Sequence, residues 1–107
     1  MRLQKFSGKQ KRPRLTLRRV VGSSMSPKLL PGNLVVATGI FKRINAGEVC
    51  IFYEGGKEKI KRVERVMKDQ VFFIGDNLSQ SSDSRQFGWI DVREVAAKVI
   101  WPRVHNI

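Results

Sequence analysis

Residues 48–74, EVCIFYEGGKEKIKRVERVMKDQVFFI, decide the fold of this chain. They contain three stretches rich in β-branched and aromatic residues, over 48–54, 59–67 and 70–74. Gly55-Gly56, between the first two stretches, suits a tight hairpin, and a second turn falls near Asp69. We therefore predict three consecutive short strands at the centre of the chain.

Short strands continue on both sides of this central run. On the amino-terminal side we predict strands over 15–21 and 34–37, the second following a Pro-Gly-Asn turn. On the carboxyl-terminal side a polar loop and a helical turn over 91–94 lead to a last strand over 97–101. Many short strands with Gly-rich turns predict a mainly β fold, a small, partly closed barrel or a pair of small sheets with short helical turns.

The length of 107 residues fits one domain, which we assign to 15–107, preceded by a basic flexible tail over 1–14. The chain carries 21 Lys and Arg against 9 Asp and Glu, a net charge of +12. Eight of the basic residues fall within 1–19, which contains no acid. This charge favours anionic partners, and we expect peripheral contact of the tail with an anionic membrane.

A basic β-barrel could equally bind nucleic acid, as OB folds do, so the fold class does not decide between these partners. Residues 1–19 are too short for a helix-turn-helix, which makes nucleic acid the less favoured partner. The longest stretch without a charge, 29–41, has 13 residues, whereas a spanning helix needs about 20. We expect no transmembrane segment and a location in the cytoplasm or at the membrane surface.

The cysteine and histidine content excludes several kinds of site. Cys50 is the one cysteine and His105 the one histidine. An internal disulfide and a His/Cys zinc cage are therefore excluded, and a His-based triad would need His105 to fold back. We expect no metal and no cofactor.

Two segments carry candidate catalytic residues, a serine in the first and a lysine in the second. In Gly22-Ser23-Ser24-Met25-Ser26-Pro27, a serine in a tight turn can present its hydroxyl while backbone N–H groups point at an oxyanion. Without histidine, the base would be a lysine or a carboxylate, and Lys61 follows a predicted hairpin. An exposed lysine has a pKa of about 10.4, but apolar neighbours such as Ile60 and Val63 could lower it. Taken alone, the first segment is more typical of a structural turn, and Lys61 of a surface lysine on a basic strand.

Lys28 is an alternative base, four positions after Ser24. The Ser-x-x-Lys pattern of penicillin-binding enzymes needs a spacing of three, and Pro27 occupies that position here. A third segment, 75–88, begins Gly75-Asp76-Asn77 and contains several serines with Asp83 and Arg85. An ion pair between Asp83 and Arg85 could brace this loop, and a serine hydroxyl could orient a neutral lysine.

The three segments together, in this order and spacing, resemble the signal peptidase I family. The matching residues are Ser24, Met25 and Pro27, then Lys61, Arg62 and Val63, then Gly75, Asp76, Asn77, Ser81, Asp83, Ser84, Arg85 and Gly88. The resemblance covers residues 20 to about 101 and implies a signal-peptidase-like (LexA-like) fold and a Ser–Lys serine endopeptidase. By position it makes Ser24 the nucleophile, Lys61 the base and Ser81 the serine that orients the lysine. It makes Asp83 and Arg85 a structural ion pair.

The chain departs from that family at several points. Gly22 stands where some members carry a hydroxyl, Gly32-Asn33 replaces the usual Gly-Asp, and these 107 residues contain neither the membrane anchor nor the large insert of some members. The compact form is similar to the short maturation proteases found with nickel superoxide dismutases.

The resemblance implies cleavage of an N-terminal leader or signal-type segment from a precursor polypeptide, bound as an extended strand with small side chains near the cut. One alternative is a dedicated maturation protease for a single cytoplasmic precursor. The other is an inactive or self-cleaving repressor-like domain that binds nucleic acid.

Overall fold

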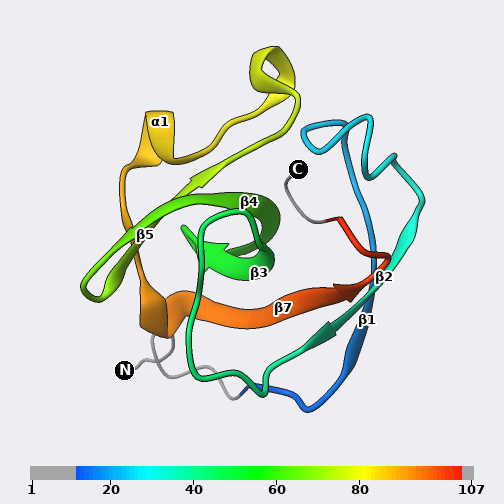
Figure 1. Ribbon diagram of the computed structural model, residues 1–107. Helices are drawn as coiled ribbons and strands as arrows, with labels where there is room; N and C mark the ends of the chain where they lie inside the picture. The colour runs from blue at the N-terminus through cyan, green and yellow to red at the C-terminus, as the bar shows by residue number, and fades with distance from the viewer. Residues whose placement is uncertain (1–11, 105–107) are drawn as a thin grey trace.

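The computed structural model describes residues 12–104, which form one sheet of seven antiparallel strands (Figure 1). The strands are β1 (Thr16–Arg19), β2 (Leu34–Thr38), β3 (Val49–Glu54), β4 (Lys57–Met67), β5 (Gln70–Ile74), β6 (Ile90–Asp91) and β7 (Val95–Trp101). Within these residues, helix is confined to single turns: η1 (Leu78–Gln80), α1 (Ser84–Phe87) and η2 (Val92–Glu94). The predicted mainly β fold is confirmed.

The sheet order β1-β2-β7-β3-β4-β5-β6 places the last strand of the chain between β2 and β3. The sheet curls strongly, but its end strands β1 and β6 do not pair with each other, so it is one open sheet and not a closed barrel (Figure 1). The predicted hairpin is present between β3 and β4, where Gly55 and Gly56 have φ of 60° and 76°. These left-handed values suit a two-residue turn and favour glycine at both positions.

Three apolar clusters fill the curled sheet. The largest lies under β3, β4 and β5, and its centre is a stacked pair, Phe52 and Phe73, with ring centroids 3.8 Å apart. The second cluster consists of Val20, Met25, Leu29, Val35 and Val49, and the third of Ala37, Ile51 and Ala97. Because Met25 and Leu29 are both fully buried, this second cluster fixes the segment that follows β1.

Residues 12–14 lie against the body of the sheet. The Pro13 carbonyl accepts a hydrogen bond from the N–H of Gly39 at 2.6 Å, and the Arg14 carbonyl accepts one from the Thr38 hydroxyl at 2.7 Å. The rest of the predicted basic tail, 1–11, lies outside the described residues, as does His105, so the division at residue 15 stays a prediction. Within 12–104, no helix is long and apolar enough to cross a membrane.

Candidate active site

Ser24 lies in a tight loop directly after β1. Gly22 has φ of 79°, a value that favours glycine, and turns the chain away from the β1 direction. A bond from the N–H of Ser26 to the Ser23 carbonyl (3.1 Å) closes the turn around Ser24. Met25 points into the core, so Ser24, its neighbour, stays partly exposed at the surface of a cavity.

Lys61 is a buried lysine on β4, with 7% of its surface exposed. Burial lowers the pKa of its ammonium group below the ordinary value, and the positive charges of Lys59 and Arg85 lower it further. The negative charge of Asp83 acts in the opposite direction but does not cancel the shift. A lysine of this kind is neutral at lower pH than a surface lysine and is better suited to act as a base.

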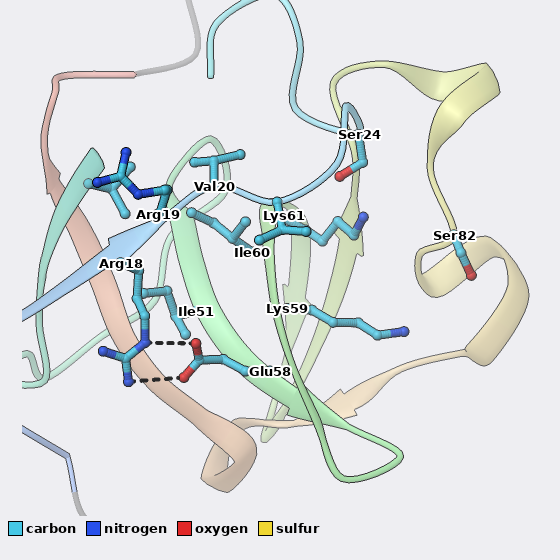
Figure 2. Close-up of a pocket in the computed structure, with 12 residues that line it drawn as sticks. Arg18, Arg19, Val20, Ser24, Ile51, Glu58, Lys59, Ile60, Lys61 and Ser82 are labelled. Atoms are coloured by element: carbon cyan, nitrogen blue, oxygen red, sulfur yellow. Dashed lines mark hydrogen bonds and ion pairs between the residues drawn. The ribbon is translucent and has the colours of Figure 1, made fainter. Parts of the chain in front are cut away.

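One cavity of about 370 Å³ brings Ser24 and Lys61 together (Figure 2). Four consecutive residues on each of two segments, 18–21 and 58–61, line its sides, and Ser82 lies at the same end as Ser24. Lys28, the alternative base, is exposed and is not among the lining residues. The cavity thus contains a hydroxyl, a buried amine and enough space for a few residues of a bound peptide.

The Gly75-Asp76-Asn77 segment holds the Ser24 loop in place. The backbone N–H of Asn77 donates to the Ser24 carbonyl at 2.8 Å, and its side-chain amide donates to the Ser23 carbonyl at 3.1 Å. Gly75 is buried between this loop and Ser81: a Cβ added at Gly75 would collide with the Ser81 hydroxyl and lie 2.8 Å from the Ser24 carbonyl oxygen. Only glycine allows these three segments to approach so closely.

Asp76 has a different partner, which the sequence did not reveal. Its carboxylate accepts two bonds of 2.7 Å from the guanidinium of Arg62, the residue after Lys61. Arg62 is 7% exposed and also donates to the carbonyls of Gly47 and Val104. The signal that could have indicated this pair is a second basic residue beside Lys61 on a buried strand, because a buried cation needs a carboxylate.

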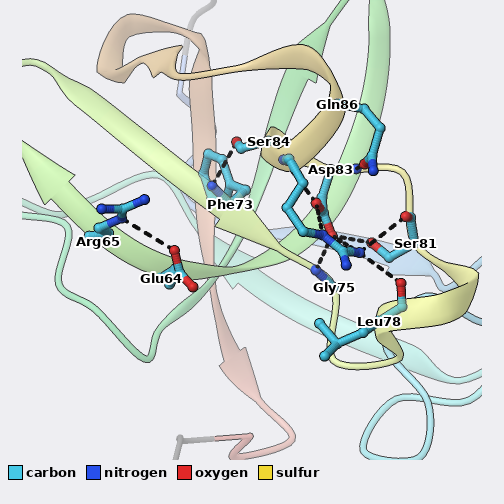
Figure 3. A network of polar contacts seen from close by, with 10 residues as sticks. Glu64, Arg65, Phe73, Gly75, Leu78, Ser81, Asp83, Ser84 and Gln86 are labelled. Atoms are coloured by element: carbon cyan, nitrogen blue, oxygen red, sulfur yellow. Dashed lines mark hydrogen bonds and ion pairs between the residues drawn. The ribbon is translucent and has the colours of Figure 1, made fainter.

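Asp83 is the centre of the polar network in the loop before α1 (Figure 3). Its fully buried carboxylate accepts bonds from the Gly75 N–H (2.8 Å), the Ser81 hydroxyl (2.7 Å) and the Arg85 guanidinium (2.9 and 3.1 Å). Burial alone would raise the pKa of Asp83, but these bonds outweigh it and hold the pKa well below its ordinary value. The carboxylate therefore stays charged and ties three parts of the site together.

The same loop contributes three serines, each with a different role. The Ser84 hydroxyl, 3% exposed, accepts a bond from the Phe73 N–H at 2.8 Å and so attaches the loop to β5. Ser81 uses its hydroxyl hydrogen on Asp83, which leaves its oxygen lone pairs to accept from an amine. Ser82, next to it, is exposed and lines the cavity.

The remaining motif residues support the Ser24 loop from outside the cavity. Met25 is fully buried, and Pro27 is exposed and lines a separate shallow depression with Asp76 and Asn77. Among residues 12–104, no three His, Cys, Asp or Glu side chains gather in a way that could hold a metal ion.

Comparison with known protein families matches residues 57–103 to "Signal peptidase, peptidase S26". The matched region contains β4 with Lys61, and the loop with Asp83 and Arg85, whereas Ser24 precedes it. No curated protein matches the chain. The mainly β sheet and the three ordered motifs agree with this match, which supports membership of the signal peptidase family, peptidase S26.

Proposed function

We propose that the chain is a serine endopeptidase with a Ser24–Lys61 dyad. Neutral Lys61 takes the proton of the Ser24 hydroxyl as its oxygen attacks a peptide carbonyl, and the lysine then gives that proton to the leaving amine. Water hydrolyses the resulting ester and frees Ser24. The observation that carries the proposal is that Ser24 and the buried Lys61, with its lowered pKa, line one cavity.

Two further groups have roles in this proposal. The Ser24 N–H would donate to the oxyanion that forms during attack. Ser81 would accept a bond from the Lys61 amine and orient its lone pair toward Ser24, while Asp83 holds Ser81 in place. The assignment of this role to Ser81 can be tested by comparison with Ser82, a neighbouring hydroxyl that lines the cavity.

The backbone around the cavity supports an extended peptide as substrate. Within residues 12–104, β1 pairs only with β2, and β4 begins to pair with β5 only at Arg62. Side chains alternate along a strand, so four consecutive lining residues on each segment mean that strand edges, and not strand faces, border the cavity. A peptide inserted between these edges would gain backbone hydrogen bonds on both sides.

The family supports removal of a leader or signal-type segment from a precursor polypeptide as the reaction in the cell. The test uses a peptide library with products detected by mass spectrometry. Ser24→Ala is expected to abolish cleavage. Ser23→Ala is expected to retain most of it, because Ser23 is not among the lining residues. Activity that survives in Ser24→Ala would contradict the proposal.

The base is tested in the same assay. Lys61→Arg is expected to be as inactive as Lys61→Ala, since a guanidinium stays protonated. Lys28→Ala is expected to remain active. An inactive Lys28→Ala beside an active Lys61→Ala would show that Lys28, and not Lys61, is the base.

A further inference from the structure

At the end of the cavity away from Ser24, two side chains connect its walls (Figure 2). Arg18 on β1 and Glu58 on β4 meet there through two bonds, 2.8 Å from Nε and 3.2 Å from Nη2. Both residues line the cavity. The contact joins two strands that share no backbone pairing in the described sheet, so it crosses the gap into which a substrate strand would insert.

Both partners are held in position by further hydrogen bonds, Arg18 within β1 and Glu58 through the neighbouring strand β3. The Arg18 guanidinium also donates to the Thr16 hydroxyl (2.7 Å) and to the Leu17 carbonyl (2.9 Å). The Glu58 carboxylate accepts a third bond from the Tyr53 hydroxyl at 3.2 Å. The bridge is thus oriented before any substrate arrives.

The position of the bridge limits the length of extended peptide that fits between it and Lys61. Glu58 precedes Lys61 by three residues on β4, and a strand rises about 3.3 Å per residue, so the bridge lies roughly 10 Å along the strand from the base. An extended peptide whose reacting bond lies at Lys61 has room for about three residues before its fourth meets the bridge.

We propose that the Arg18–Glu58 bridge closes the substrate cleft on one side of the cut, so that the site recognises about three residues there and a longer extended segment has to open the bridge. This inference rests on the proposed function. It makes Arg18 and Glu58 specificity-determining residues that act on the length of the bound segment and not on the bond that is cut.

The cost of opening the bridge is small, because both side chains are substantially exposed, at 45% and 32%. Exposed ion pairs of this kind change an equilibrium by roughly two- to fivefold. The bridge is therefore a selective restriction and not an absolute block, and high salt weakens it. The nearby pair of Lys59 and Glu54 (2.9 Å) provides a control, because Glu54 does not line the cavity.

The test uses capped peptides built around a cut found with the library, lengthened from two to six residues separately on each side. For wild type, kcat/KM on one side is expected to stop rising after about the third residue. In Glu58→Ala, the ratio of kcat/KM for the six-residue to the three-residue peptide on that side is expected to rise roughly two- to fivefold. Glu54→Ala is expected to leave this ratio at the wild-type value.

Two further measurements make the result decisive. Arg18→Glu together with Glu58→Arg rebuilds a bridge of opposite polarity and is expected to restore the wild-type ratio. Fluorescence anisotropy with the same peptides and Ser24→Ala gives their affinities without turnover, and the same length limit is expected there. The limit in wild type is also expected to weaken in 1 M salt, where the Debye length is about 3 Å.

The inference and the proposed function fail in different ways. If wild type cleaves the peptides but the length ratio is the same in Glu58→Ala, the bridge is not the restriction and the dyad assignment is unaffected. If wild type cleaves none and Ser24→Ala binds none, both are overturned. A ratio that changes equally in Glu54→Ala would show a general effect of charge and would overturn the inference.

Discussion

Asp83→Ala should destabilise the protein far more than Asp91→Ala, although the two residues make the same local contact. Each is followed two positions later by an arginine, accepts that residue's backbone N–H, and forms an ion pair with its guanidinium. They differ in burial: the side chain of Asp83 is 0% exposed, and that of Asp91 is 33% exposed. The pair therefore separates the effect of burial from the effect of the motif.

The magnitude follows from the bonds that each substitution removes. Asp83→Ala leaves the buried Gly75 N–H without its acceptor, at a cost of about 1–3 kcal/mol. It also removes the N-cap of α1, at a cost of about 1 kcal/mol. The total is about 2–4 kcal/mol, which for a domain of this size lowers Tm by roughly 10–25 °C. Asp91→Ala loses the cap of η2, about 1 kcal/mol or less, and an exposed ion pair with Arg93 that contributes little to stability.

Thermal unfolding followed by circular dichroism at pH 7 measures both variants against wild type. The carboxylate of Asp83 has a lowered pKa, so its contribution is present above its unfolded pKa of about 3.9 and is lost as pH falls toward the folded value. The difference in Tm between wild type and Asp83→Ala is therefore expected to shrink in acid. Equal Tm changes in the two variants at pH 7 would refute this account of the buried network.

Three other predictions test the site and the tail. Gly75→Ala is expected to abolish cleavage while the fold is retained, because the added Cβ displaces Ser81 and the Ser24 carbonyl; full activity would contradict the close approach seen there. In wild type, activity is expected to rise with pH as Lys61 loses its proton, below the ordinary lysine pKa. Arg85→Ala should move that rise to higher pH, because a charge that lowers the pKa of Lys61 is gone, whereas Arg93→Ala should not move the pH–rate profile. Finally, the full chain is expected to co-sediment with anionic vesicles at low salt, with about 1 kcal/mol from each engaged basic residue, and deletion of 1–11 should weaken this without affecting cleavage. An unchanged sedimentation after the deletion would exclude the tail as the contact.

Much of the fold was predictable because its signals are local. The Gly55-Gly56 turn and the β-rich stretches around it produce β3, β4 and β5 close to their predicted bounds. Strand β6 has two residues, too few for any alternation to be visible, and it was not predicted. The position of β7 between β2 and β3 depends on how the sheet curls, which no local pattern reports.

The motifs of the site were visible in the sequence, but their partners were not. Arg62 with Asp76, and Arg18 with Glu58, are 14 and 40 residues apart, and each pair depends on two strands or loops meeting in space. Adjacent serines present the same difficulty. Ser81 and Ser82 are equivalent in a sequence, but in the structure Ser81 donates to Asp83 while Ser82 lines the cavity.

The proposed lysine base would create a conflict, which the loop before α1 resolves. A buried carboxylate near Lys61 stabilises the protonated amine, which is the wrong form for a base. Asp83 is such a carboxylate, and the loop needs it to hold Gly75 and Ser81 in place. Arg85 pairs with Asp83 and adds a positive charge that lowers the pKa of Lys61. Under the proposed dyad, burial of Lys61 and the charges of Lys59 and Arg85 together keep its amine available as a base, while the loop keeps a buried, charged aspartate.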